Sequence, residues 1–226
     1  MKLYTYFRSS AAYRVRIALN LKGIEAELVP VHLLKDGGEQ FSAAYSDKNP
    51  QNLVPLLEDG ELRLPQSLAI IEYLDEIHPQ APLLPADARG RARVRALSQL
   101  IASDIHPIDN LRVLKYLSDR LGVTPEQKTE WYRHWVTLGL EALERQLAGS
   151  AATGRFCHCD TPTIADCCLV PQLYNARRFD CDLAPYPTLT AIADRCEALP
   201  AFEAARPENQ PDRSKQSGAS GNGRDI

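Results

Sequence analysis

The first 23 residues place a strand and a helix in direct succession, with two hydroxyl side chains at the junction. Residues 3–7 read as an apolar strand, and residues 11–22 show helical spacing that Gly23 ends. Ser9 and Ser10 stand where the helix begins. Free backbone N–H groups and the helix dipole make such a position suitable for a thiolate or another anion. A serine there more often caps the helix, so the junction alone leaves both roles open.

The pattern that follows predicts a small mixed sheet. A second strand is expected at residues 28–33, where Pro30 favours an edge position. Strands at residues 55–58 and 61–64 flank Asp59-Gly60, a typical two-residue hairpin turn. A helix over residues 67–77 follows, with Ser67 as its expected N-cap. Strand–helix–strand units favour parallel pairing, and a hairpin adds an antiparallel edge, so residues 1–80 predict a thioredoxin-like α/β domain.

Strand signals end at a proline-rich linker, residues 79–85. Helical periodicity then covers about residues 87–120, 125–147, 163–178 and 188–199, which predicts an all-α domain over residues 86–206. Thr163 and Asp166 have the spacing of a capping box. Residues 207–226 are rich in Gly, Ser, Asn and Gln, so we expect a disordered tail there.

Composition narrows the classes of partner. A net charge of −3 over 226 residues gives no sign of nucleic-acid binding, and no apolar run is long enough to span a bilayer. The N-terminus lacks the pattern of a secretory signal. All six cysteines lie between Cys157 and Cys196, and we expect them to be reduced thiols in a cytoplasmic protein. Cys157-His158-Cys159 lacks a second ligand pair, so no metal site is expected.

Seven motifs along the chain combine residue types and spacings that are found together in one family: residues 6–10, 14–19, 35–41, 49–50, 54–55, 66–74 and 182–187. They closely resemble the zeta class of glutathione transferases, which includes maleylacetoacetate isomerases, and bacterial maleylpyruvate isomerases look similar. The resemblance covers residues 1–212. It implies a thioredoxin-like domain joined to an all-helical domain, glutathione as cofactor and a homodimer. Fold alone is weak warrant for function, so the individual residues matter.

Glutathione is a small zwitterion with two carboxylates and one thiol. Ser67 at a helix start, with Gln66 beside it, suits the γ-glutamyl carboxylate. The resemblance implies that Val54 precedes a cis-proline and pairs through its backbone with the cysteinyl part of glutathione. It further implies a contact from Gln40 to the glycyl side, although a solvent-facing glutamine is the alternative.

The resemblance also points to two residues of the second domain, His106 and Asn110, as contacts to glutathione. A buried, satisfied histidine is the alternative for His106.

We expect Ser9 to donate the hydrogen bond that favours the reactive thiolate, with Ser10 as the alternative donor. The family often has cysteine after the two serines, whereas this chain has Ala11, so the reacting sulfur must come from glutathione.

The reaction implied is cis–trans isomerisation: the thiolate adds to an activated double bond, the bond rotates, and elimination restores it as trans. The substrate is a small dicarboxylate, which arginine side chains suit through bidentate pairing. Arg8 and Arg178 match the family's substrate-binding arginines. Arg112 and Arg177 add positive charge. Arg14 and Arg16 are expected to be structural.

The sequence therefore predicts a glutathione-dependent isomerase of maleylacetoacetate or maleylpyruvate, with Arg8, Ser9 and Ser10 in catalytic positions. Two alternatives remain. One is a general zeta-type transferase that acts on α-haloacids or other electrophiles. The other is a non-catalytic module of the same fold, against which the set of Ser9, Val54, Gln66 and Ser67 argues.

Overall fold

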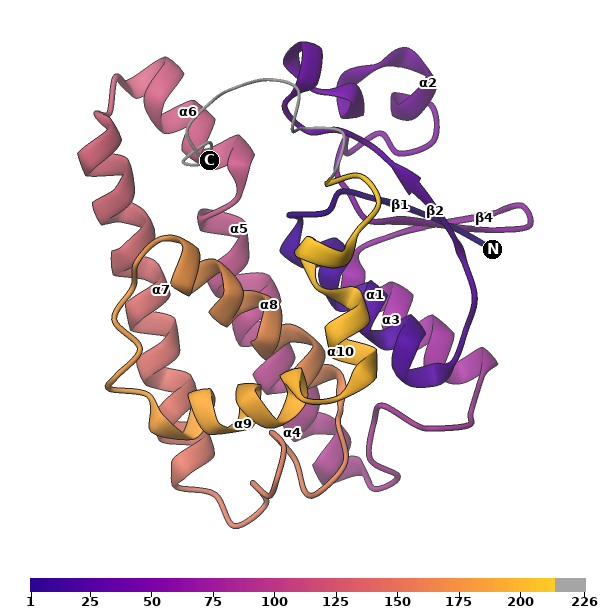
Figure 1. Cartoon of the computed structure of the whole chain (residues 1–226), viewed down its shortest axis with the longest axis vertical. Helices are drawn as coiled ribbons and strands as arrows, with labels where there is room; N and C mark the ends of the chain where they lie inside the picture. Colours follow the sequence, from indigo (N-terminus) through magenta and orange to yellow (C-terminus); the bar gives the residue numbers. More distant parts are fainter. Residues whose placement is uncertain (214–226) are drawn as a thin grey trace. The chain divides into compact units, whose positions relative to one another are not determined.

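The computed structural model describes residues 1–213, which form two compact units. Unit 1 comprises residues 1–83 and 198–213, and unit 2 comprises residues 84–197. Unit 1 contains the sheet, whereas unit 2 consists of helices and their connections (Figure 1). The predicted fold class, an α/β part followed by an all-α part, is confirmed.

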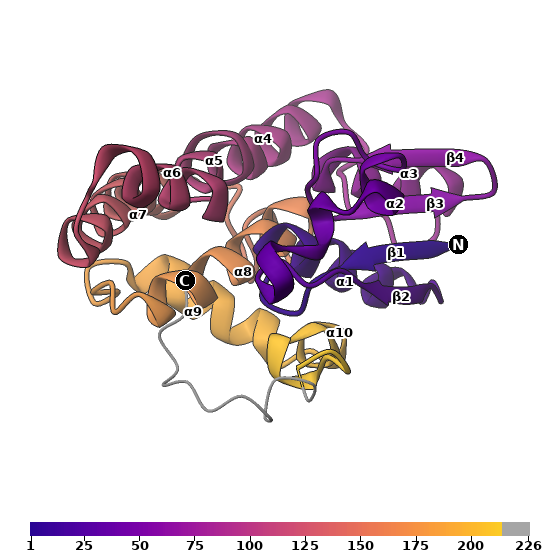
Figure 2. The same cartoon turned by 90° about the horizontal axis from the view of Figure 1, so that it is seen from above.

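The sheet of unit 1 has the strand order β2-β1-β3-β4, which Figure 2 shows from above. Its strands are β1 (Lys2–Thr5), β2 (Glu27–Pro30), β3 (Leu56–Asp59) and β4 (Leu62–Pro65). β1 pairs in parallel with β2, and β3 pairs antiparallel with both β1 and β4. The parallel unit, the hairpin and the edge position of β2 with its Pro30 are as predicted. β2 begins one residue earlier than expected and ends at Pro30.

Alternate residues of β1 face the two sides of the sheet, as strand geometry requires. Thr5 accepts a hydrogen bond at its Oγ1 from Arg16 of helix α1 (Ser10–Lys22), 3.0 Å away. Tyr4 instead packs its ring against Tyr45 of α2 (Ala43–Ser46), with ring centroids 5.8 Å apart. Helices α1 and α3 (Ser67–Ile77) pack on each other. Side chains of α1 thus contact one face of the sheet, and side chains of α2 contact the other.

The C-terminal part of unit 1 differs from the predicted domain boundaries. Helix α10 (Pro200–Ala205) packs against α1, so residues 198–213 belong to unit 1 and not to the helical part (Figure 1). A short 3₁₀ turn, Pro207–Asn209, follows α10, and Gln210 and Asp212 are buried. The beginning of the expected tail is thus ordered, since it makes hydrogen bonds with the domain. Residues 214–226 of that tail lie outside the described residues.

Unit 2 is built from α4 (Ala88–Gln99), α5 (His106–Ile108), α6 (Leu111–Leu121), α7 (Pro125–Ala148), α8 (Ile164–Arg178) and α9 (Pro187–Glu197). Helix α8 packs against both α4 and α9, and most of its residues are buried. The capping box at its start is present, because the Thr163 amide donates to Asp166 Oδ2 at 2.7 Å.

The helix predicted over residues 87–120 is interrupted. A π-helical turn, Leu100–Ile105, leads from α4 into α5, and the chain then leaves the helix before α6. Pro107 lacks an amide hydrogen, and Asn110 caps α6 by accepting the Arg112 amide at 3.1 Å. The side chain of Ile105 lies over Gly139 of α7, where a Cβ atom would collide with it. The glycine thus permits the π turn to approach α7.

None of the described helices combines the length and apolar character needed to cross a membrane. Within residues 1–213, no group of three or more His, Cys, Asp or Glu side chains is arranged to hold a metal ion. All six cysteines are free thiols.

Asp109, between α5 and α6, is a buried carboxyl group. Neither of its oxygens has a hydrogen-bond partner among the described residues. Burial raises its pKa from 3.8 to about 8. The negative form is therefore penalised in the folded state but not in the unfolded chain.

We expect Asp109→Asn to remove a pH-dependent loss in the free energy of unfolding. Because the folded pKa lies above the unfolded one, the stability linked to this group is complete below about pH 4 and is lost as the pH rises to about 8. The slope is about 1.4 kcal/mol per pH unit. Urea unfolding between pH 5 and 9 should show that the variant's advantage grows with pH. An advantage that is constant over this range would contradict the assignment.

Candidate functional site

The loop between β1 and α1 carries Ser9 as the N-cap of α1. Its Oγ accepts a hydrogen bond from the Ala12 amide at 3.2 Å, and its own amide donates to Tyr6 O at 2.9 Å. A hydroxyl that accepts in this way keeps its proton for another acceptor, so capping and thiolate binding are compatible. Ser10, the first residue of the helix, is buried, whereas Ser9 is only partly buried. Ser9 is thus the more accessible hydroxyl at the helix start.

Arg8 lies directly before Ser9 and is partly buried. Its Nη2 lies 3.5 Å from Tyr6 Oη, and its guanidinium group stands 5.1 Å from the centroid of the Phe7 ring. Both contacts place the cation of Arg8 against the aromatic side chains of the same loop.

Arg16 of α1 holds the backbone of this loop. Its buried guanidinium group donates to Tyr6 O at 3.3 Å and to Phe7 O at 3.0 Å. It also donates to Thr5 Oγ1, and through Nε to Ala205 O of α10 at 3.2 Å. Arg16 therefore fixes the loop carrying Arg8 and Ser9, which is a more specific role than the structural one expected from the sequence.

The start of α3 is the second candidate anion site of unit 1. The structure places Gln66 as the N-cap, not Ser67 as predicted, because Ser67 already has helical geometry. Gln66 adopts φ 74°, a left-handed conformation that non-glycine residues rarely take and that often marks functional positions. Ser67 is buried, and its Oγ accepts a hydrogen bond from Nη1 of the buried Arg14 at 3.2 Å.

Gln40 and Val54 lie on two other segments of unit 1. Gln40 is buried and not solvent-facing: its Nε2 is 3.4 Å from Leu33 O, while its Oε1 has no partner among the described residues. The peptide bond between Val54 and Pro55 is cis, as expected. Val54 packs in one apolar cluster with Tyr6 and Phe7.

Unit 1 thus supplies the groups that a small zwitterion such as glutathione needs. The start of α1 offers a hydroxyl for a sulfur, and the start of α3 offers amides and a hydroxyl for a carboxylate. The Arg14–Ser67 hydrogen bond ties these two helix starts together, and Val54 packs against the loop that bears Ser9. The orphaned Gln40 Oε1 is a further acceptor for an N–H group. These residues fit the cofactor expected from the sequence.

The predicted site residues of unit 2 form separate groups. His106 and Asn110 approach each other, with His106 Nε2 and Asn110 Nδ2 3.5 Å apart. Arg112 is exposed on the first turn of α6.

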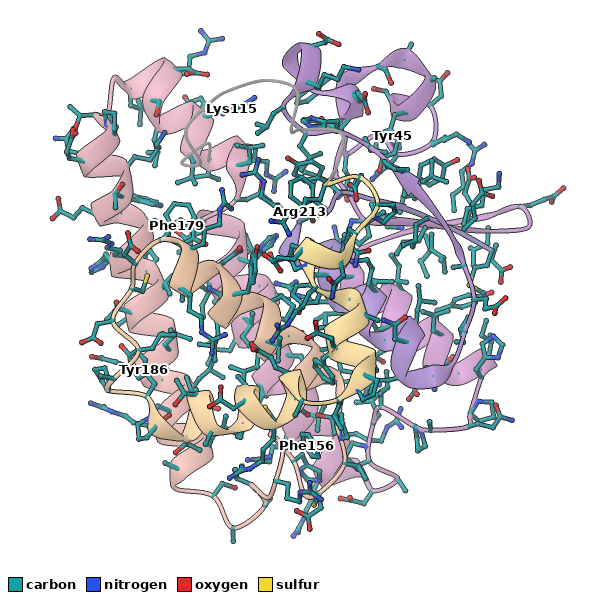
Figure 3. All side chains as sticks on the ribbon, viewed as in Figure 1. Tyr45, Lys115, Phe156, Phe179, Tyr186 and Arg213 are labelled. Atoms are coloured by element: carbon teal, nitrogen blue, oxygen red, sulfur yellow. The ribbon has the colours of Figure 1, made fainter. Side chains whose placement is uncertain are left out.

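The adjacent arginines at the end of α8 differ in their surroundings. Arg177 pairs with Glu197 at 2.8 Å and approaches Asp194 at 3.9 Å, so its charge is compensated on α9. Arg178 instead stands over the ring of Phe179, 5.4 Å from its centroid. Phe179, labelled in Figure 3, stacks on Tyr132 with ring centroids 3.6 Å apart. The two neighbours thus differ in what surrounds them: acidic side chains of α9 around Arg177 and an aromatic ring beside Arg178.

The cysteines are all in unit 2, and none is in residues 1–156. Burial raises the pKa of the Cys157, Cys167 and Cys196 thiols, which disfavours the thiolate. Ala11 therefore leaves the start of α1 without any protein thiol in its own unit, as expected from the sequence.

Sequence reasoning missed the specific roles of Arg14 and Arg16. Residues 11–19 of α1 are apolar apart from these two arginines. That pattern was a signal for specific partners, because charged side chains are seldom fully buried unless they are paired. Asp212 was missed as well: its Oδ2 accepts the Phe7 amide at 2.9 Å. No local pattern could have revealed that contact.

Comparison with known proteins agrees with this geometry. Residues 3–82 match the family model "Glutathione S-transferase, N-terminal domain". A probable maleylacetoacetate isomerase of Vibrio cholerae is 55% identical over 210 residues, covering 93% of this chain and 97% of the relative.

Two solved structures are also similar. One is the holo structure of a maleylpyruvate isomerase, a bacterial zeta-class glutathione transferase, with a TM-score of 0.91 and 48% identity over 94% of this chain and 99% of the other. The second is a maleylacetoacetate isomerase of Methylobacterium extorquens with bound malonate and glutathione. Its TM-score is 0.90 and its identity 43%, over 94% and 99% of the two chains. From the family match and these identities over nearly the whole length, the chain belongs to the glutathione S-transferase family.

Proposed function

We propose that this chain is a glutathione-dependent cis–trans isomerase that converts maleylacetoacetate or maleylpyruvate to the fumaryl isomer. One observation carries the proposal: a partly exposed serine caps α1, and in the same unit Arg14 of α1 donates a hydrogen bond to Ser67 at the start of α3. The names of the similar proteins support the reaction, because they share about half of this sequence over nearly its full length.

The residues of unit 1 prepare the sulfur. When bound, glutathione supplies the thiolate that adds to the cis double bond and leaves after the bond has rotated. The Ser9 hydroxyl donates a hydrogen bond to that sulfur, and the free amides at the start of α1 add positive potential. Ser67, Gln66, Gln40 and the Val54 backbone hold the rest of the cofactor, with His106 and Asn110 of unit 2 as further contacts.

Cationic side chains orient the substrate. Arg8 and Arg178 bind its carboxylates, and their charge stabilises the negative charge that develops on the substrate carbonyl oxygen. Arg112 adds positive charge for the anionic substrate. Arg177 is already paired with Glu197, and this pairing weakens its claim to bind a substrate carboxylate.

Isomerase assays with both maleyl substrates test the proposal directly. Purified protein with glutathione should form the fumaryl product, and protein without glutathione should not. The general transferase that acts on α-haloacids is the second candidate, since the same thiolate site would serve it. Conjugation of a haloacid without any fumaryl product would overturn the isomerase assignment in its favour.

Ser9→Ala should impair chemistry more than cofactor binding. Loss of a hydrogen bond to a charged group costs about 1.5–3 kcal/mol, or roughly 10- to 100-fold in kcat. The ultraviolet absorbance of the bound thiolate should show its pKa rising by about one to two units. Ser10→Ala is the matched control and should change kcat less. A larger fall in kcat for Ser10→Ala than for Ser9→Ala would make Ser10 the donor to the thiolate. If Ser9→Ala changed only the affinity for glutathione, Ser9 would be a helix cap and not the donor.

Arg178→Ala should raise KM for the diacid roughly tenfold or more, because it removes a charge-assisted contact. Its neighbour Arg177→Ala removes the same charge from a residue already paired with Glu197, and its KM should stay near that of the wild type. Steady-state kinetics at fixed glutathione separate the two variants. Equal changes in KM for the two variants would show that the substrate carboxylate depends on the overall charge at the end of α8 and not on a contact with Arg178.

We further propose that the protein is a cytoplasmic homodimer. The family resemblance supports the dimer, and the set of free cysteines agrees with a reducing compartment. Light scattering should give twice the 25.2 kDa chain mass, and a monomeric mass would contradict the dimer.

A further inference from the structure

The peptide group between Tyr6 and Phe7 is held at both of its polar ends. Its carbonyl, Tyr6 O, accepts the Ser9 amide at 2.9 Å and Nη1 of Arg16 at 3.3 Å. Its amide, Phe7 N, donates to Oδ2 of Asp212 at 2.9 Å in a buried setting. The carbonyl and amide of a trans peptide point in opposite directions, so the two sets of bonds fix the orientation of one rigid plane.

The orientation of this plane sets the position of Ser9. If the plane rotated, Tyr6 O would lose the Ser9 amide, and the cap at the start of α1 would move with it. Arg16 restrains the carbonyl end and the next carbonyl, Phe7 O. Among the described residues, Asp212 is the acceptor that holds the amide end.

Asp212 is buried in the C-terminal segment, residues 198–213, which is itself attached to α1. The side chain of Gln210 donates from Nε2 to Ala204 O and Arg206 O, each at 2.9 Å. The α10 backbone is attached to α1 through Asn20, whose Nδ2 donates to Ala201 O at 2.8 Å, and through the Arg16–Ala205 contact. A carboxylate that accepts a buried amide forms a charge-assisted bond, which is stronger and more directional than a neutral one.

We propose that Asp212 is a positioning residue for the reaction: by holding the Phe7 amide, it fixes the loop that presents Arg8 and Ser9 to the cofactor sulfur and the substrate. In this role Asp212 acts through the Tyr6–Phe7 peptide. The proposal rests on the proposed function, because it assigns a role within that reaction.

Asp212→Ala tests this role in the full-length chain. A misplacement of about 1 Å can cost on the order of 10²-fold in rate, so kcat should fall about 10- to 100-fold. The pKa of the bound glutathione thiol, followed by its ultraviolet absorbance, should rise in the same variant. Asp212→Asn keeps an oxygen acceptor of the same shape and should recover most of kcat.

Glu203→Ala is the matched control. Glu203 also lies in the C-terminal segment, but its carboxylate accepts Asn209 Nδ2 at 3.2 Å and pairs with Arg206 at 3.2 Å, both within that segment. This variant loses the same charge and should keep the wild-type kcat and thiol pKa.

Thermal unfolding and calorimetric binding of glutathione separate positioning from simple stability. A purely structural role would lower Tm in Asp212→Ala but leave kcat and the thiol pKa unchanged at a temperature where the variant is folded, and this result would overturn the proposal. Should the alanine variant fail to fold, Asp212→Glu, which displaces the carboxylate by one methylene, must show the same fall in kcat. If the wild-type protein forms no fumaryl product, the proposed function fails instead, while the thiol pKa comparison still tests Asp212.

Discussion

The arrangement of the β1–α1 loop in unit 1 depends on the hydrogen bonds of the buried guanidinium group of Arg16. It joins three parts of the chain: the end of β1 through Thr5, the following loop through Tyr6 O and Phe7 O, and α10 through Ala205 O. A buried cation is costly unless its donors are satisfied, and the fixed fork of a guanidinium group can reach several carbonyls at once. A loop conformation without the Tyr6 and Phe7 carbonyls at these places would cost Arg16 two of its hydrogen bonds.

Arg14 performs a related task two residues earlier on the same helix. It reaches Ser67 at the start of α3, whereas Arg16 reaches the loop before α1. Helix α1 is buried on several sides, which gives both arginines protein partners in place of water. One helix thus coordinates the two helix starts proposed to bind the sulfur and the carboxylate of glutathione. Asp212 completes the arrangement from the far end of the described chain.

Much of the fold could be predicted because its signals are local. The apolar residues of β1, the hairpin turn and the spacing of α1 and α3 each lie within a short stretch of sequence. The turn was predicted at Asp59-Gly60 and lies one residue later, at Gly60-Glu61. The break at Asn110 was missed because Pro107 is tolerated near the start of a short helix and the apolar spacing continues past it. The cis bond after Val54 was expected from family resemblance and not from the residues themselves.

The contacts that support the candidate site are distant in sequence, and this explains why they escaped prediction. Arg16 and Ala205 are 189 positions apart, and Phe7 and Asp212 are 205 apart. A charged residue in a helix is usually solvated, and a segment rich in polar residues usually lacks order. Local patterns therefore predicted no specific partner for Arg16 and a disordered tail that included Asp212. Only the tertiary structure shows that opposite charges from the two ends of the chain meet at one loop.

Amide hydrogen exchange of Phe7 in the ligand-free protein tests this constraint most directly. Phe7 lies in a loop, where amides usually exchange quickly. If Asp212 and Arg16 fix the Tyr6–Phe7 peptide, the Phe7 amide should exchange as slowly as the Val31 amide, which donates to Thr5 O next to the sheet. Exchange as fast as that of Gly60 in the exposed hairpin turn would contradict a loop held by these two side chains.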